Sequence, residues 1–193
     1  NSYSGNQNNT QGDTGLEVAH SGTVASWTNS GAGTMHAVDL TNLGGESNPS
    51  DWAIMFWQDN VITQTVGIAA NKSGTSYEVN FDYGTAVYAQ MSQRTLAGDE
   101  LLVEVLRGDN SVLASGTFAP GEWVDGTTGN WNLQAGLQGT LPYVGDGTGD
   151  VRVRIGPSAG TLNQGRFAGE IDNLSVDLIP EPSSSVLFGL GGL

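Results

Sequence analysis

Cysteine is absent from the 193 residues, and lysine occurs once, at Lys72. Without cysteine the chain can form no disulfide and no thiolate metal site, and it has no thiol nucleophile. The scarcity of cations leaves a formal net charge of −14 at pH 7. Because nucleic acids and anionic membranes bind to clustered Lys and Arg, this composition disfavours both as partners. It is compatible with divalent cations, neutral sugars and an extracellular location.

Long amphipathic helices are also missing, since no stretch shows their period. Only 13% of the residues are charged, whereas glycine occurs 29 times, which indicates many short strands and turns. We expect one β domain over residues 16–179, between a polar leader (residues 1–15) and a C-terminal segment (residues 180–193). The chain starts at Asn1 without Met or a signal peptide, so we expect a processed N-terminus.

Period-2 alternation is the main structural signal. Apolar residues alternate with polar ones over residues 77–83 and 151–155, as in strands with one buried face. Alternation returns over residues 166–179, with a slip at Asp172-Asn173 that indicates a bulge. Gly108-Asp109-Asn110 is typical of a hairpin turn. These patterns predict an all-β, antiparallel β-sandwich.

The strand order carries a family resemblance. The phrases YEVNFDYG, LLVEVLRGDNSVLASG and GRFAGEIDNLSV follow one another as in galactose-binding-like jelly rolls, which are common among carbohydrate-binding modules. The resemblance covers most of residues 16–178 and implies a jelly-roll fold.

The end of the chain, GEIDNLSVDLIPEPSSSVLFGLGGL, resembles that of bacterial exported proteins of the PEP-CTERM class. In that class the tripeptide, here Pro180-Glu181-Pro182, is recognised by an exosortase. The resemblance implies an extracellular or cell-surface location on a bacterium. Residues 186–193 are far shorter than the ~20 apolar residues of a spanning helix, so this segment alone cannot cross a bilayer.

A structural Ca²⁺ is the one cofactor that the galactose-binding-like resemblance implies. Its ligands would be Glu17 and Asp172, completed by backbone carbonyls, and hard oxygen ligands suit this ion. The alternative is that Asp172 caps the bulge through its own backbone and Glu17 is exposed. The acidic motif GDGTGD at residues 145–150 occurs once, which favours a plain turn.

Tryptophan is the candidate for contact with sugar rings or with another subunit. If the apolar run of residues 51–70 supplies central strands, alternation places Trp52 and Trp57 on opposite faces, so one of them is exposed. Trp123 and Trp131 lie in a Gly-rich loop, where exposure is plausible, and Trp27 is a further candidate. The alternative for all of them is an ordinary place in the core.

Catalytic motifs are weak. The sequence GPSAG around Ser158 matches a nucleophile elbow, but no helical period follows it and only His20 and His36 can partner it. Carboxylate pairs such as Glu100 with Glu104, or Asp146 with Asp150, are no evidence of glycoside hydrolysis, because sequence spacing does not show their separation. Alternation predicts that Glu104 is solvated or at a sheet edge. We therefore expect no catalytic residues and no enzyme.

Two functions remain. The favoured hypothesis is an exported structural protein that assembles with copies of itself, its leader or its apolar tail bridging neighbours by strand addition. The alternative is a carbohydrate-binding module that attaches cells or enzymes to extracellular polysaccharide. A hydrolase ranks last.

Overall fold

The computed structural model describes residues 3–4, 18–19, 23–24, 27–30, 35–39, 52–57, 61–88, 98–120, 131–159 and 168–180. The strands are β1 (Tyr3–Ser4), β2 (Val18–Ala19), β3 (Thr23–Val24), β4 (Trp27–Ser30), β5 (Met35–Asp39), β6 (Trp52–Trp57), β7 (Val61–Gly67), β8 (Ser76–Tyr88), β9 (Leu101–Leu106), β10 (Val112–Phe118), β11 (Trp131–Val144), β12 (Val151–Pro157) and β13 (Ala168–Leu178). In the described residues the only helical element is a 3-10 turn, η2 (Ile68–Ala70), which lies between β7 and β8.

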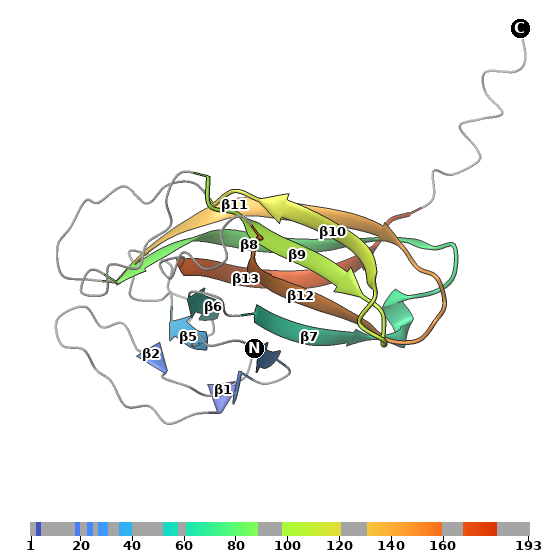
Figure 1. Cartoon of the computed structure of the whole chain (residues 1–193), viewed down its shortest axis with the longest axis horizontal. Coiled ribbons are helices and arrows are strands. Elements are labelled where there is room, and N and C mark those ends of the chain that lie inside the picture. Colours follow the sequence, from blue (N-terminus) through green and yellow to red (C-terminus); the bar gives the residue numbers. More distant parts are fainter. Residues whose placement is uncertain are drawn as a thin grey trace, which may run out of the picture.

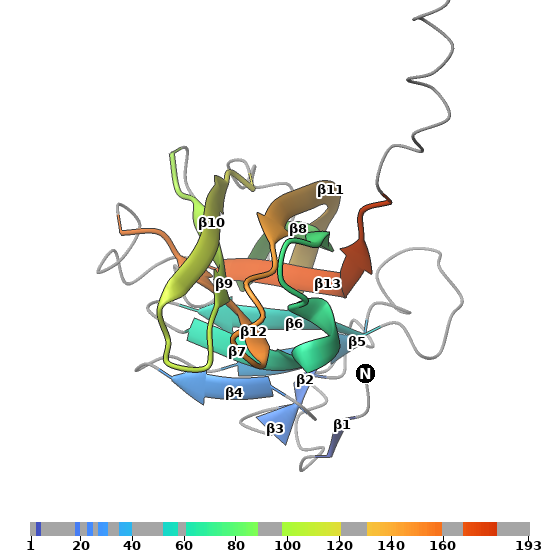
Figure 2. The same cartoon turned by 90° about the vertical axis from the view of Figure 1, so that its right-hand side faces the viewer.

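Two sheets form a β-sandwich. The smaller sheet has the strand order β10-β9-β12-β7-β4, and the larger sheet has the order β11-β8-β13-β6-β5-β2. From β6 onward the chain passes repeatedly between the sheets, and its long strands run along the long axis of the molecule (Figure 1). Figure 2 shows the same layers from a second side. All pairings between described strands are antiparallel, so the predicted antiparallel β-sandwich is confirmed.

The core lies between the sheets, as the alternation predicts. In β12, Val151, Val153 and Ile155 are fully buried, whereas Arg152 and Arg154 are half-buried on the other face. In β8 the odd-numbered residues from Tyr77 to Phe81 are buried in the same way. Burial of such side chains stabilises the fold by about 25 cal/mol per Å² of apolar surface removed from water.

The predicted hairpin between β9 and β10 is confirmed. The Asp109 carboxylate accepts hydrogen bonds from the backbone N–H and the hydroxyl of Ser111, at 2.9 and 2.7 Å. These bonds lower the pKa of Asp109. Asn110 has φ 71°, in the left-handed region that Asn tolerates. Turn chemistry that is visible in the sequence therefore sets this connection.

The densest apolar run also forms inner strands, as predicted. Strand β6 lies between β13 and β5, and β7 lies between β12 and β4. Near the N-terminus, Tyr3 and Ser4 pair with Val24 and Thr23. The other leader residues, and the tail beyond Pro180, lie outside the described residues. Within the described part of the chain, no helix is long and apolar enough to span a membrane.

One prediction for the smaller sheet is wrong. Glu104 is neither solvated nor at an edge, since it is 7% exposed and β9 lies between β10 and β12. Arg154, directly opposite on β12, donates from Nε to Glu104 Oε2 at 2.6 Å. Alternation identified the outward face of the strand, but it did not reveal that a cross-strand guanidinium permits a carboxylate to be buried there.

At one end of the sandwich, Asp146 joins two loops. Its carboxylate accepts hydrogen bonds from the Thr148 backbone and hydroxyl, from the Asn71 amide and from Arg107. These bonds, led by those from Thr148 and Arg107, hold its pKa well below the usual range. The sequence predicted a plain turn at residues 145–150. The Asp146 carboxylate anchors this turn to Asn71 and Arg107.

Candidate functional site

The outer face of the larger sheet, which points away from the core, carries a polar hollow. On β8 the buried odd-numbered residues alternate with Glu78, Asn80 and Asp82, which therefore lie on this outer face. The register places Thr140 of β11 opposite Asn80, and Gln138 opposite Asp82. Cross-strand partners share a face, so these four side chains stand side by side.

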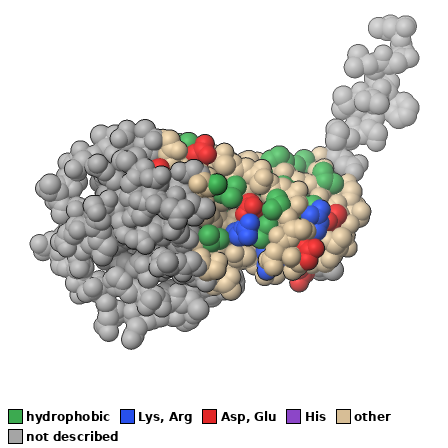
Figure 3. All heavy atoms as spheres, in the orientation of Figure 1, with side chains coloured by type: hydrophobic (Ala, Val, Ile, Leu, Met, Phe, Trp, Pro, Cys, Tyr) green, Lys and Arg blue, Asp and Glu red, His purple; other side chains and the backbone are tan. Residues whose placement is uncertain are grey.

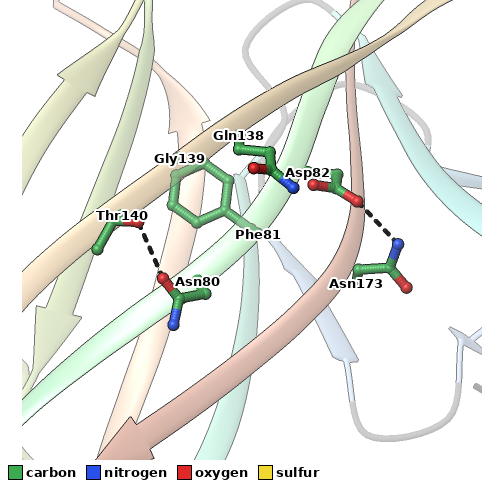
Figure 4. Close-up of a pocket in the computed structure, with 7 residues that line it drawn as sticks. All are labelled: Asn80, Phe81, Asp82, Gln138, Gly139, Thr140 and Asn173. Atoms are coloured by element: carbon green, nitrogen blue, oxygen red, sulfur yellow. Dashed lines mark hydrogen bonds between the residues drawn. The ribbon is translucent and has the colours of Figure 1, made fainter. Parts of the chain in front are cut away.

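The hollow has a volume of about 350 Å³. Figure 4 shows the seven residues that line it, and five of them are uncharged polar or acidic: Asn80, Asp82, Gln138, Thr140 and Asn173. Phe81 and Gly139 lie between the two polar pairs and are directly opposite each other. A Cβ at position 139 would approach the Phe81 ring to 2.3 Å, so any other residue there would force the ring to move.

Hydrogen bonds fix one wall of the hollow. Thr140 Oγ1 donates to Asn80 Oδ1 at 2.9 Å. The Asn80 Nδ2 then donates to Glu78 Oε1 at 3.1 Å and to Asp177 Oδ2 at 3.2 Å. Ser175 also donates to Asp177, and its hydrogen bond, followed by that of Asn80, lowers the pKa of Asp177. Asn80 is therefore held in one orientation before any ligand arrives.

The opposite wall depends on the bulge in β13. The register against β8 shifts between Asp172 and Ser175, as the sequence predicted. Asn173 has φ 49°, and its Nδ2 donates to Asp82 Oδ2 at 2.8 Å. The extra residue thus places an amide beside the carboxylate in the hollow, a common use of bulges near sites.

Several groups of the hollow keep unused hydrogen-bonding capacity. Within the described part of the chain, the Gln138 carboxamide makes no hydrogen bond, and Asp82 Oδ1 accepts none. Gln138 is exposed, and in Figure 4 it lies near Asp82. Together they offer acceptors and donors at fixed places on rigid strands, which suits a ligand rich in hydroxyl groups.

The tryptophans that were predicted to contact a sugar or another subunit lie in different parts of the fold. Trp27 is 4% exposed in the core, so its candidacy as a surface contact was wrong. Trp123 lies outside the described residues. Trp131 is the first residue of β11, so its predicted place in a Gly-rich loop was wrong, and it pairs with Tyr88, an even-numbered position of β8. The register therefore assigns position 131 to the outer face of the larger sheet.

The positions of Trp52 and Trp57 differ by register. Ile54 of β6 pairs with Ile171, which is 1% exposed in the core. Position 52 therefore belongs to the inner-face series of β6, and position 57 to the outer-face series. Of the predicted contacts, Trp57 and Trp131 are thus the two whose positions share a face with the hollow.

The calcium prediction has only one described ligand. Asp172 is half-buried, and its Oδ1 accepts a hydrogen bond from the Asn173 backbone at 2.7 Å, as the alternative of a capped bulge requires. Glu17 lies outside the described residues. Among the described residues, no three carboxylate or imidazole groups gather to hold a metal ion. Calcium at Glu17 and Asp172 therefore stays a prediction.

The remaining motifs show no assembled catalytic group in the described residues. Ser158 is 6% exposed at the end of β12, and its backbone N–H donates to the Glu100 carbonyl at 2.9 Å. A nucleophile elbow instead exposes its serine between a strand and a helix. Pro180 is exposed after β13, whereas Glu181 and Pro182 lie outside the described residues, so the sorting motif is untested. The absence of enzymatic activity likewise stays a prediction.

The sequence analysis did not identify the residues of the hollow. Asn80 and Asp82 lay inside a recognised strand, so the polar half of its alternation was the available signal. Asn173 stood at the recognised slip in alternation. Gln138 and Thr140 gave no signal, because their role depends on the register between β11 and β8.

No protein-family model matches the sequence, and no curated protein matches it. Among solved structures, the chain is similar to the CBM22-1 xylan-binding domain from Paenibacillus barcinonensis, with a TM-score of 0.50 and 12% identity over 84% of this chain and 94% of that chain. It is also similar to an arabinose-bound α-L-arabinofuranosidase, with a TM-score of 0.50 and 13% identity over 83% of this chain and 25% of that chain.

A third similar structure contains the CBM22-1 and GH10 modules of an endo-1,4-beta-D-xylanase from Clostridium thermocellum, complexed with xylohexaose. It has a TM-score of 0.48 and 13% identity over 81% of this chain and 27% of that chain. At such identities, the similarity of the xylan-binding domain establishes the fold, a jelly-roll β-sandwich of the kind found in carbohydrate-binding modules.

Proposed function

We propose that this chain is a carbohydrate-binding module that holds a polysaccharide on the outer face of its larger sheet. The observation that carries this proposal is the hollow itself, where Asn80 and Asn173 are fixed by hydrogen bonds while Gln138 and Asp82 keep open positions. Sugar hydroxyl groups both donate and accept hydrogen bonds, so they complement such a mixed set. The fold shared with a xylan-binding domain supports the same function.

Rigid placement favours this use. The hollow is built on three paired strands, β11, β8 and β13, so binding requires little ordering of loops. The outer-face positions of Trp57 and Trp131 lie on β6 and β11, further along the same sheet. A polysaccharide track that continues from the hollow along this face of the sheet would pass these positions.

The self-assembling structural protein, favoured from the sequence, has less support. The segments assigned to strand addition are the leader and the apolar tail, and most of both lies outside the described residues. The comparisons support its alternative, because the similar domain is a binding module. Export to the outside of a bacterium, through exosortase processing, remains part of the proposal as the setting in which the chain would meet polysaccharide.

Binding is tested by affinity electrophoresis and calorimetry with xylan, mixed-linkage glucan, mannan and cellulose. We expect at least one polysaccharide to bind, and Gln138→Ala to weaken that binding roughly tenfold through the loss of one or two hydrogen bonds. Trp131→Ala should weaken it as well if the track extends along β11.

Ser115→Ala is the matched control. Ser115 is exposed at the middle of β10, and it lies on the outer face of the smaller sheet, opposite Glu104. This variant should bind as the unmodified chain does. Equal losses of affinity in Gln138→Ala and Ser115→Ala would contradict the proposed site.

A further inference from the structure

We infer that the hollow prefers sugar units that carry a protonated amine, as in a deacetylated amino-sugar polymer, over neutral units, and that it rejects units with a carboxylate. This inference rests on the proposed function and specifies its ligand class. It starts from Asp82, the one acidic residue among the seven that line the hollow.

One carboxylate oxygen of Asp82 is open in the hollow. Its Oδ2 is bound by Asn173 Nδ2 at 2.8 Å, which holds the carboxylate in place. Its Oδ1 has no hydrogen bond within the described part of the chain, and neither has the adjacent Gln138 carboxamide. An ammonium group donates three hydrogen bonds. It can therefore donate to the open Asp82 Oδ1 and keep two further hydrogen bonds for water or for other groups of the hollow.

The surroundings of Asp82 add charge of the same sign. Asp172, opposite it on β13, and Glu78 and Asp177, further along the outer face, are all acidic. The side chains that donate hydrogen bonds to Glu78 and Asp177 are neutral: Asn80 and Ser175. Such a face attracts cations and repels anions over roughly a Debye length, about 10 Å at 0.1 M salt.

The described cations all lie elsewhere. Arg154 binds Glu104 on the outer face of the smaller sheet, and Arg107 binds Asp146 at one end of the sandwich. Arg152 of the same sheet donates to the carbonyls of Arg107 and Gly108, each at 3.1 Å. Lys72 is exposed in the loop after η2. Within the described residues, therefore, no cationic side chain on the outer face of the larger sheet is available to form an ion pair with a ligand carboxylate.

The test compares sugars with one backbone. Calorimetry in low-salt, mildly acidic buffer would use β-1,4-linked hexamers of glucosamine, N-acetylglucosamine and glucose, and an oxidised β-1,4-glucuronan. We expect the glucosamine hexamer to bind roughly tenfold more tightly than the two neutral hexamers, because charge-assisted hydrogen bonds are about twice as strong as neutral ones. The glucuronan should not bind, and added salt should reduce the amine preference.

Asp82→Asn keeps the shape of the hollow and the bond to Asn173, so it should equalise the three hexamers. Asp150→Asn is its control, because it changes the net charge equally at an exposed residue in the loop after β11. Equal affinity for amine and neutral hexamers, or an amine preference that survives Asp82→Asn, would overturn the inference and leave the proposed function intact. Absence of binding to every neutral and amine-bearing sugar, on this and the earlier panel, would overturn both.

Discussion

The two outer faces of this sandwich treat their polar groups in opposite ways. On the smaller sheet, Glu104 and Arg154 satisfy each other across β9 and β12. On the larger sheet, Asp82 and Gln138 keep open hydrogen-bonding positions. Figure 3, which faces the smaller sheet, shows basic and acidic side chains next to each other, as this pairing requires. The difference separates polar groups that stabilise the fold from those available to a ligand.

Net charge alone does not make that distinction. Both faces carry acidic residues, but Glu104 is 7% exposed and opposite a guanidinium, whereas Asp82 is half-buried and opposite an amide. A carboxylate that has its cation within the chain adds little attraction for ligands. The face that can bind a ligand is therefore identified by which acidic residues lack a cross-strand cation, and not by the number of acidic residues on each face.

The largest effect is expected on the smaller sheet. Arg154→Ala should lower the free energy of unfolding by about 3 kcal/mol, because it leaves the buried Glu104 carboxylate without its cation. Urea unfolding followed by tryptophan fluorescence measures the loss. Polysaccharide affinity should not change in the folded variant.

The double variant Arg154→Ala with Glu104→Leu is the control for this ion pair. Removing both charges should restore most of the lost stability, since the cost arises from the unpaired carboxylate. A loss below 1 kcal/mol in the single variant, or reduced sugar binding, would break the contrast between the two faces.

The next effect concerns the floor of the hollow. Gly139→Ala should lower the free energy of unfolding by about 2 kcal/mol, because overpacking forces neighbours to move. The Phe81 ring, 2.3 Å from the added Cβ, is held against Phe118 with ring centroids 4.9 Å apart. Thermal unfolding and calorimetry should show reduced stability and reduced affinity together.

Gly108→Ala provides the comparison for that substitution. An added Cβ there has its nearest neighbour, the Asp150 carbonyl oxygen, at 4.0 Å. Its stability should stay within about 0.5 kcal/mol of the unmodified chain. Equal destabilisation by the two alanines would show that loss of glycine, rather than contact with Phe81, is the cause.

A buried polar group on the inner face allows a test by pH. The Tyr143 hydroxyl donates to the Ala70 carbonyl at 2.6 Å, and burial raises its pKa to about 12. A raised pKa means that the folded state holds the proton more tightly, so its contribution to stability is complete below pH 10 and lost as pH rises towards 12 and beyond.

Tyr143→Phe should cost about 1.5 kcal/mol at neutral pH and should flatten this alkaline part of the stability profile. Urea unfolding at a series of pH values measures both changes. An unaltered alkaline decline in the phenylalanine variant would assign the titration to another group.

The smallest expected effect lies in the fixed wall of the hollow. Asn80→Ala should cost about 1 kcal/mol, because it removes the amide that links Thr140 with Asp177. It should also weaken polysaccharide binding, whereas Ser115→Ala on the other outer face should change neither quantity. Unchanged binding by Asn80→Ala would mean that the wall is structural only.

Much of the fold could be predicted from the sequence, because its signals are local. The alternation of Val151, Val153 and Ile155 gave the face of a strand, and Gly108-Asp109-Asn110 gave a hairpin turn. The slip at Asp172-Asn173 indicated the bulge. Each of these features depends on residues that are neighbours in the chain.

The candidate site could not be predicted in the same way. Asp82 and Gln138 are 56 positions apart in the sequence, and only the β8–β11 register makes them neighbours. The burial of Glu104 on β9 depends in the same way on Arg154, which lies 50 positions later in the sequence, on the neighbouring strand β12. Alternation assigns a face to each residue, but it does not state which residue stands opposite on the next strand.

The bulge in β13 also shifts the inward–outward alternation of the strand by one residue. Between Asp172 and Ser175 the strand advances three residues while β8 advances two, so Ile171 and Val176 can both lie opposite core residues. The additional residue belongs to neither alternation. At φ 49° the backbone admits few residue types besides Asn, Asp and Gly. Position 173 can therefore hold an amide (Asn), a carboxylate (Asp) or no side chain (Gly). Each choice would change the ligand that the surface recognises and leave the core unchanged.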